Sequence, residues 1–239
     1  MLYTLDAVRD NIRNREGRRV FYLGKGDQLT IGARDFLARE RIEILPAEQA
    51  KPDSYRLLSG GSVTEKPEHM THLNGNVLVP KTHPRIAFRG AVDMLEAELL
   101  LCQLSAGEKL RRQLGEVLEL TRKLIRWDVL EEPAEDAPLC GLTMQELRQH
   151  SHRPQDYYGQ PHFMPSAEDG AVILQLNRAR CAARQAELLA VAAFSDREGN
   201  PTRTDLLRVM NRLSSMLYIF MIREKAHCGG PSRAPAPTE

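Results

Sequence analysis

The chain has 239 residues, of which 42% are hydrophobic and 27% charged, and its formal net charge is +1. This length suits one medium-sized domain with a small appendage, and the composition is typical of a soluble globular protein. The balanced charge does not favour a nucleic-acid or membrane-surface partner, no apolar run could span a bilayer, and no secretory signal follows Met1. We therefore expect a cytoplasmic protein with no nucleic-acid and no membrane partner.

Residues 1–50 predict a small α+β module. The expected elements are a helix over Leu5–Asn14, a strand over Arg19–Leu23, a turn over Gly24–Asp27, a helix over Thr30–Arg39 and a strand over Ile42–Leu45. Gly24, Lys25, Gly26 and Thr30 do not have the G-x-x-x-x-G-K-[ST] spacing of a phosphate-binding loop. A glycine-rich turn at the end of a strand is the better interpretation.

Residues 51–82 contain three prolines and three glycines and show little periodicity, which predicts a linker or irregular structure. His69 and His72 lie three residues apart in this segment, but no cysteine or suitably spaced acidic residue completes a metal site. Solvated histidines are therefore favoured over metal ligands.

Residues 83–227 predict a mainly α, antiparallel bundle of about five helices. The helices are expected at Arg85–Leu104, Ala106–Leu130, Thr143–Gln149, Ala171–Phe194 and Asp205–Arg223. Thr143 and Glu146 form a capping-box pattern at the start of the third helix. The histidine- and tyrosine-rich stretch 150–165 is expected to be an irregular loop that covers a ligand, and residues 228–239 to be a disordered tail.

The helix over Ala171–Phe194 carries the most informative pattern. Small apolar residues recur along one face, which predicts close packing against other helices; they are Val172, Leu176, Ala179, Ala183, Ala186 and Ala190. Asn177, Arg180, Arg184 and Glu187 lie between this face and a second apolar strip of Leu174, Cys181 and Leu188. Charges placed between packed helices need a partner or an anion. The alternative is a buried ion-pair network, or a wider solvated face.

Two further features bear on this pattern. Asp93, on the helix over Arg85–Leu104, could supply the carboxylate that pairs with Arg180 or Arg184. The four cysteines, Cys102, Cys140, Cys181 and Cys228, are scattered along the chain, which indicates reduced and mostly buried thiols.

Three segments resemble one family in the right order. PRIAFRGAVD at Pro84–Asp93 resembles the DPRVxAYGxVDELN segment of the PduO-type ATP:cob(I)alamin adenosyltransferases. Arg180-x-x-x-Arg184-Gln-Ala-Glu187 resembles their RTxCRRAE helix, and Asn211–Ser214 resembles their NRLSD motif. The EutT branch is closer still, because it shares Thr71–Leu73, Lys81-x-x-Pro84-Arg85, Leu147-x-x-x-Ser151-His152-x-Pro154 and NRLSS at Asn211–Ser215. The resemblance covers the chain except its tail.

Two departures from the family pattern change what is expected of the chain. The EutT type usually carries a CCxxC metal site, but Tyr55, Arg56 and Ser59 hold the cysteine positions here, so no transition-metal site is expected. The PduO-type YTKTGDxGxT phosphate loop is missing from its place directly before the bundle.

The resemblance implies transfer of the 5′-deoxyadenosyl group of ATP to cob(I)alamin, forming adenosylcobalamin and releasing triphosphate. It implies that Asp93 pairs with Arg180 and that Arg184 contacts the phosphates, and these three are the expected catalytic residues. The expected ATP and Mg²⁺ site comprises Arg180, Arg184, Glu187, Asn211, Arg212, Lys81 and Arg85, and the expected corrinoid site Phe163, His162 and Tyr157. Such a reaction needs positioning and charge stabilisation, because cob(I)alamin is itself the nucleophile.

The resemblance also implies a homo-oligomer, a trimer with sites between subunits or alternatively a dimer, and an electron-donor flavoprotein as a further partner. A role in ethanolamine utilisation and association with a bacterial microcompartment are expected on the same ground. Two other functions are considered: a non-catalytic corrinoid carrier or microcompartment subunit, and a helical interaction protein. Intact Arg180, Arg184, Glu187 and Asn211 argue against a carrier, which has no use for a triphosphate site.

Overall fold

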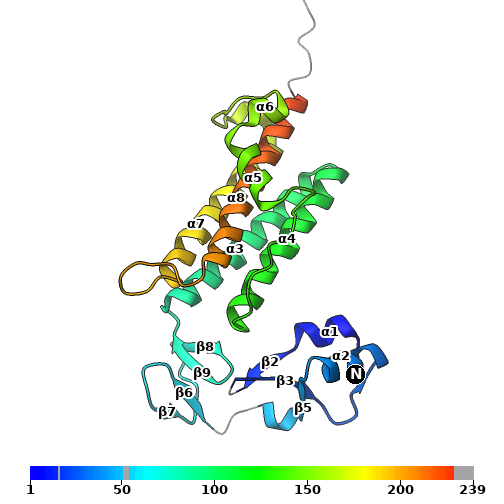
Figure 1. Ribbon diagram of the computed structural model, residues 1–239, viewed down its shortest axis with the longest axis vertical. Helices are drawn as coiled ribbons and strands as arrows, with labels where there is room; N and C mark the ends of the chain where they lie inside the picture. Colours follow the sequence, from blue (N-terminus) through cyan, green and yellow to red (C-terminus); the bar gives the residue numbers. More distant parts are fainter. Residues whose placement is uncertain (16, 51–53, 229–239) are drawn as a thin grey trace, which may run out of the picture. The chain divides into compact units, whose positions relative to one another are not determined.

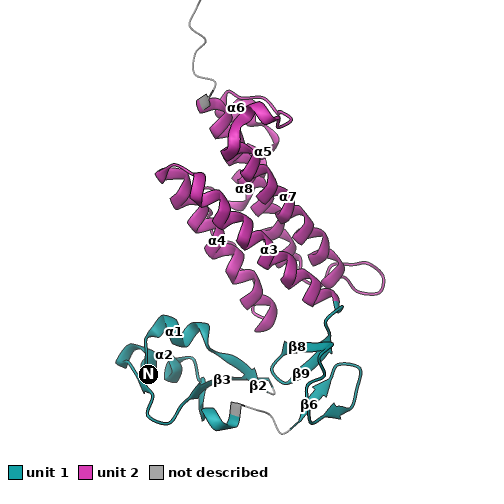
Figure 2. Cartoon of the chain, turned by 180° about the vertical axis from the view of Figure 1, so that it is seen from behind, with its two compact units in different colours: residues 1–83 teal, residues 84–239 magenta. Residues whose placement is uncertain are grey.

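The computed structural model describes residues 1–15, 17–50 and 54–228, except for the side chains of Ala50 and Cys228. The chain divides into two compact units, one of residues 1–83 and one that begins at Pro84 (Figure 2). The boundary thus lies one residue from the predicted start of the bundle. Residues 229–239 of the predicted tail lie outside the described residues.

The first half of unit 1 is the expected α+β module. Helices α1 (Leu5–Asp10) and α2 (Ile31–Arg39) begin at Thr4 and Thr30, whose hydroxyls each accept a backbone N–H at 3.3 Å. Strand β3 (Arg18–Leu23) pairs in parallel with β5 (Glu43–Pro46) and antiparallel with β2 (Arg13–Arg15). Strands β1 (Leu2–Tyr3) and β4 (Gln28–Leu29) form a second, parallel pair, and a 3₁₀ turn, η1, spans Ala47–Ala50.

Two details of this module bear on the sequence predictions. The helix predicted over Leu5–Asn14 ends at Asp10, because residues 13–15 join the sheet as β2; their side chains are all polar, so they carry no strand pattern. The turn at Gly24–Asp27 is confirmed: the Asp27 carboxylate accepts the Gly24 N–H at 3.2 Å and pairs with the Met1 ammonium at 2.6 Å. The Gly24 amide, which a phosphate-binding loop would use, therefore already donates to the Asp27 carboxylate.

The prediction of a linker over residues 51–82 is wrong for residues 55–80. They form a four-stranded sheet in the order β7 (Ser62–Val63), β6 (Tyr55–Leu57), β9 (Val77–Pro80), β8 (Met70–Asn74). Strands of two to five residues are too short to show an alternating pattern. The β8–β9 turn centres on Gly75, whose φ is +50° and whose position would bring a Cβ within 2.4 Å of the Asn14 carbonyl oxygen.

Unit 2 is the predicted mainly α bundle (Figure 1). Four long helices run side by side: α3 (Pro84–Ser105), α4 (Glu108–Val129), α7 (Gly170–Ala193) and α8 (Thr204–Cys228), with α3 packed between α4 and α7, and α7 between α3 and α8. The short α5 (Met144–His152) and α6 (Pro154–Tyr158) pack against α8. None of the helices in the described ranges is long and apolar enough to cross a membrane.

The stretch predicted to be irregular is partly helical. The capping box of Thr143 and Glu146 is present, but α5 continues to His152, and α6 follows with Pro154 at its first position. A further 3₁₀ turn, η2 (Ala167–Asp169), leads into α7. Only the segment between α6 and η2, residues 159–166, remains irregular.

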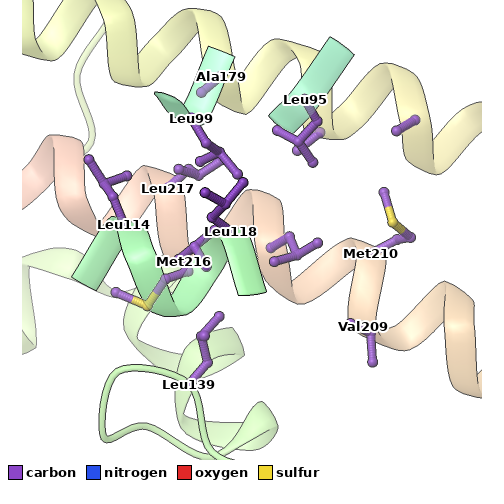
Figure 3. Packing of buried hydrophobic residues seen from close by; sticks show 14 of the residues in the cluster. Leu95, Leu99, Leu114, Leu118, Leu139, Ala179, Val209, Met210, Met216 and Leu217 are labelled. Carbon is purple, nitrogen blue, oxygen red and sulfur yellow. The ribbon is translucent and has the colours of Figure 1, made fainter. Parts of the chain in front are cut away.

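Leucine and methionine side chains from α3, α4 and α8 fill the core of the bundle, as Figure 3 shows for Leu99, Leu114 and Leu217. Helix α7 contributes small residues instead: Ala179, Ala183, Ala186 and Ala190 are fully buried, which lets it approach its neighbours closely. The predicted small-residue seam is therefore confirmed, apart from Val172, which is half-buried.

The second apolar strip of α7 is not buried. Leu174 is 36% exposed, Leu188 66% exposed, and Cys181 lies on the same outer face. The prediction of mostly buried thiols thus fails for Cys181, whereas Cys102 is buried and Cys140 half-buried. A helical wheel shows that these apolar residues share one face of α7, but it does not show whether that face is buried or exposed.

Candidate functional site

The facing sides of α7 and α8 carry several of the polar side chains that the sequence singled out, among them Arg180, Glu187 and Asn211. Asn211, Tyr218 and Lys225 recur every seven residues on α8, so all three point to the same side of that helix. Their partners are Glu187 and Arg180 on α7 and Asp169 just before it, in reverse chain order. The two antiparallel helices therefore share one continuous polar face.

At one end of this face, a chain of hydrogen bonds links the two helices. The Asn211 side-chain amide donates to Glu187 Oε1 at 2.7 Å, and Arg212 Nη2 donates to Asn211 Oδ1 at 2.5 Å. The hydroxyls of Ser214 and Ser215 both donate to the Asn211 carbonyl oxygen, at 3.0 and 3.2 Å. Asn211 is thus fixed on both its side chain and its backbone, and it aligns a carboxylate with a guanidinium.

At the other end, Arg180 borders a cavity of about 530 Å³. Its Nε and Nη2 donate to Asn177 Oδ1 at 3.2 and 3.0 Å, and its guanidinium carbon lies 5.8 Å from the centre of the Tyr218 ring. The residues that line this cavity are His162, Phe163, Met164, Pro165, Asn177, Arg180, Tyr218 and Met221. It therefore combines one cation with an apolar and aromatic wall.

The segment that leads into α7 closes one side of the cavity. His162 Nε2 lies 3.2 Å from the His152 carbonyl oxygen, which can only accept, so Nε2 donates; Nδ1 lies 2.9 Å from the Tyr218 hydroxyl and forms a hydrogen bond with it. Lys225 lies 5.6 Å from the centre of the Phe163 ring and forms an ion pair with Asp169. Hydrogen bonding by Lys225 lowers the pKa of Asp169 below its usual value. These bonds hold the segment against α8.

Arg184 lies between the two ends. It is exposed, one turn from Arg180 and three residues from Glu187, and it has no hydrogen bond or ion pair within the described residues. A cation without a protein partner, flanked by ordered polar groups, is available to an anionic ligand.

The expected pairing of Asp93 with Arg180 is not formed within the described chain. Asp93 is exposed on α3, whereas the Arg180 guanidinium bonds to Asn177, three residues away on its own helix. On the same helix, Glu98 pairs with Arg178 of α7 and Glu96 with Arg122 of α4.

Two other predicted residues, Arg85 and Tyr157, are engaged elsewhere in unit 2, and Lys81 belongs to unit 1. Arg85 is held by the fully buried Asp128 of α4, with Nε at 2.7 Å from Oδ1, so it already has a carboxylate partner within the bundle. Tyr157 stacks on His150 at 3.7 Å and does not line the cavity. Lys81 is exposed in unit 1.

Sequence reasoning did not include Tyr218, Asn177 or Lys225 in the site. The signal for Tyr218 and Lys225 was present, since they follow Asn211 at seven-residue intervals and so share its helical face. Asn177 was placed in the groove with Arg180 and Arg184, but no role was attached to it.

The described residues contain no group of three or more His, Cys, Asp or Glu side chains that could hold a metal ion by themselves. Glu187 and Asn211 still offer oxygen donors beside Arg184. Mg²⁺ is commonly held by one or two carboxylates together with substrate phosphates, and the donor set here suits that mode.

The α7–α8 face thus places Arg180 at the border of an apolar, aromatic-lined cavity on a helical bundle. The sequence model of the family described as "Cobalamin adenosyltransferase" matches residues 62–224, more than half of the chain. The chain therefore belongs to the cobalamin adenosyltransferase family.

Two curated relatives, the corrinoid adenosyltransferases EutT of Salmonella typhimurium LT2 and Escherichia coli K12, are each 32% identical to this chain. The alignments cover 74% and 67% of this chain, and 67% and 60% of the respective relatives, or about two thirds of their lengths. Among solved structures, a variant PduO-type ATP:corrinoid adenosyltransferase from Lactobacillus reuteri, complexed with cobalamin and ATP, matches at 18% identity and a TM-score of 0.45, over 74% of this chain and 90% of that one.

Proposed function

We propose that the chain is an ATP:corrinoid adenosyltransferase that transfers the 5′-deoxyadenosyl group of ATP to cob(I)alamin on the α7–α8 face. The observation that carries this proposal is the arrangement of Arg180, Arg184, Glu187 and Asn211. Arg184 has no partner within the described residues, the other three side chains are held by hydrogen bonds, and an apolar cavity opens beside Arg180. Membership in the cobalamin adenosyltransferase family and the names of the two relatives support it.

In the proposed reaction, the cobalt(I) electron pair attacks C5′ of ATP. A cobalt–carbon bond forms, the C5′–oxygen bond breaks, and the pair of electrons in that bond leaves with triphosphate. The protein needs to place C5′ in line with cobalt and to stabilise the charge that develops on the leaving phosphate chain. Arg184 is the residue proposed to contact that chain, because its guanidinium is exposed and unpaired within the described residues.

Mg²⁺ would bind at Glu187 together with the ATP phosphates and would supply further positive charge there. Asn211 keeps Glu187 oriented through its 2.7 Å hydrogen bond. Arg180, held by Asn177 and Tyr218, marks the border between the phosphate-binding and the corrinoid-binding parts of the site.

The cavity beside Arg180 is the proposed corrinoid site. Phe163 lines it, and His162 fixes the same segment to Tyr218, so both predicted residues keep a role in this proposal. An apolar aromatic on the lower face of the corrinoid would favour loss of the lower axial ligand and so ease reduction of the cobalt. Tyr157, outside the cavity, is not part of the proposed site.

The position of Asp93 favours a homo-oligomer. Its carboxylate projects from α3 and is not paired with Arg180 of the same chain, so the expected pair would form only with Arg180 of a second copy. The exposed apolar side chains Met94, Leu101 and Leu188 on α3 and α7 would be covered in the same contact. We propose a trimer, with a dimer as the alternative.

The partners beyond ATP and corrinoid follow from the same proposal. A flavoprotein would supply the electrons that reduce cobalt, and the product would serve a cofactor-dependent enzyme of ethanolamine utilisation, in association with a bacterial microcompartment. A non-catalytic carrier is not favoured, because a carrier would not require Arg184 and the ordered Glu187–Asn211 pair.

The test is an anaerobic assay with chemically reduced cob(I)alamin, ATP and Mg²⁺, in which the cobalt spectrum is followed over time. The wild type is expected to form a light-sensitive alkylcobalamin. Arg184→Ala is expected to slow that reaction at least a hundredfold, in the range seen when a group that stabilises the transition state is removed. Arg197→Ala, which removes an exposed arginine in the loop after α7, is the matched control.

Three results would contradict the proposal. No turnover together with a change in the corrinoid spectrum on binding would indicate a carrier. No turnover and no spectral change would indicate a packing role for the arginines. Equal activity in Arg184→Ala and Arg197→Ala would remove Arg184 from the site.

A further inference from the structure

The Arg212 side chain is incompletely bonded. Nη2 donates to Asn211, but Nη1 is buried and has no hydrogen-bond partner within the described residues. Leaving a buried donor unpaired is costly, more so for a charged group, and native proteins rarely do it without a reason. The missing partner is an acceptor, because a guanidinium has only donors.

The charged groups around Arg212 are mostly cations. Arg208 lies one turn earlier on α8, and Arg148 projects from α5, which packs on α8. Burial, followed by the charges of Arg148 and Arg208, lowers the pKa of Arg212, whereas Glu187 acts in the opposite sense. Glu187 carries one negative charge near Arg212, but it bonds to Asn211 and gives Arg212 Nη1 no hydrogen bond.

The two outer arginines are weakly engaged. Arg148 is exposed, and its guanidinium forms no hydrogen bond or ion pair in the part of the chain that the structure describes. Arg208 contacts Asp136 at 3.4 Å, but both side chains are about 60% exposed, so this ion pair contributes little. Arg212 therefore has two weakly engaged guanidinium groups near it and an Nη1 without an acceptor, so an anion bound beside these arginines would offset their mutual repulsion.

We propose that Arg148 and Arg208 act with Arg212 as an oligophosphate-binding cluster that holds the distal end of the ATP phosphate chain and of the released triphosphate. This inference rests on the proposed function for the identity of the nucleotide, but not for the binding of an oligophosphate. Neither Arg148 nor Arg208 belongs to a segment in which a family phosphate contact is expected.

The cluster fits a chain of phosphates better than a single carboxylate. Guanidinium groups bind phosphate oxygens in a bidentate manner, and three of them match an anion that carries charge along its length. Arg212 follows Asn211 directly and donates to its side chain, so the arginine cluster lies next to the Glu187–Asn211 pair. It also supplies cations on a chain that lacks the glycine-rich phosphate loop of the PduO type directly before its bundle.

The experiment measures binding of inorganic tripolyphosphate and of adenosine to the full-length chain, with Mg²⁺, by titration calorimetry. Arg148→Gln and Arg208→Gln are each expected to weaken tripolyphosphate binding about tenfold or more, as for a lost charge-assisted hydrogen bond, and to reduce its salt dependence. Adenosine affinity is expected to stay unchanged. Arg112→Gln removes an arginine that is 73% exposed on α4 and serves as the control.

Wild-type affinity for tripolyphosphate in both arginine variants would overturn the inference, as would an equal loss in Arg112→Gln. A loss of adenosine binding would also overturn it, because it would place the arginines at the nucleoside. The two proposals can fail separately. Tripolyphosphate binding that depends on Arg148, without adenosyl transfer, refutes the proposed function alone, whereas transfer that is indifferent to Arg148 and Arg208 refutes this inference alone.

Discussion

Replacement of Asp128 is expected to destabilise the bundle strongly. Asp128 is fully buried at the end of α4, where Arg85 Nε and Arg89 Nε of α3 donate to its two carboxylate oxygens at 2.7 and 2.6 Å. Both arginines are themselves largely buried, with side chains 17% and 15% exposed. Asp128→Asn keeps the shape of the side chain but removes the charge that both guanidinium groups share.

The expected loss in free energy of unfolding follows from these contacts. Breaking a buried ion pair by removing one partner costs about 3–5 kcal/mol, since the remaining charge stays buried and uncompensated. Asparagine retains one acceptor oxygen, so one hydrogen bond survives and a loss of about 3 kcal/mol is expected. For a unit of this size the midpoint of thermal unfolding should fall by about 6–12 °C.

The only tryptophan in the sequence makes the assay specific to the bundle. Trp127 precedes Asp128 and is 3% exposed, so its fluorescence in urea reports the unfolding of unit 2. Glu135→Gln is the control, because it removes an exposed carboxylate 2.9 Å from Lys123 and should cost less than about 1 kcal/mol. A loss in Asp128→Asn no larger than that of the control would refute the reasoning.

Two further predictions concern other parts of the chain. Gly75→Ala should destabilise unit 1 by about 1–3 kcal/mol, because the new Cβ would meet the Asn14 carbonyl oxygen at 2.4 Å and φ is +50°. The unfolding of unit 2, followed by Trp127 fluorescence, should not change. Hydrogen exchange in β8 and β9 measures the local loss of stability, and unaltered protection of these strands would contradict the prediction. Asp169→Asn should lower stability at neutral pH. Because Lys225 lowers the native pKa of Asp169 below 3.8, the extra stability of the wild type is lost as pH falls through that native value. Urea unfolding of both proteins at several pH values measures the difference in free energy of unfolding. A difference that does not change with pH would contradict the prediction.

The helices of unit 2 could be predicted because each carries many turns of one period and recognisable ends. Thr143 and Glu146 mark the start of α5, and the alanines of α7 mark its packed face. The short strands of residues 55–80 could not, since two to five residues give no period and their pairing depends on distant segments. The Asn74-Gly75 dipeptide between β8 and β9 is typical of a hairpin turn, but it does not define the strands on either side.

The part of the candidate site that lies on the single helix α7 could be predicted from the sequence. The spacing of Asn177, Arg180, Arg184 and Glu187 fixes their common side of α7 whatever surrounds them. Partners across helices were not predictable, because they depend on how far each helix is rotated about its axis. Arg180 therefore bonds to Asn177 of its own helix rather than to Asp93, and Arg85 bonds to Asp128.

The most direct test of the central claim is the stoichiometry of products from cob(I)alamin and ATP under anaerobic conditions. Adenosylcobalamin is measured by its spectrum before and after exposure to light, and the phosphate product by phosphorus NMR. One intact triphosphate is expected for each cobalt–carbon bond formed, since attack at C5′ releases the whole phosphate chain. Formation of ADP, or of phosphate without a cobalt–carbon bond, would mean that ATP is hydrolysed on this face and would contradict adenosyl transfer.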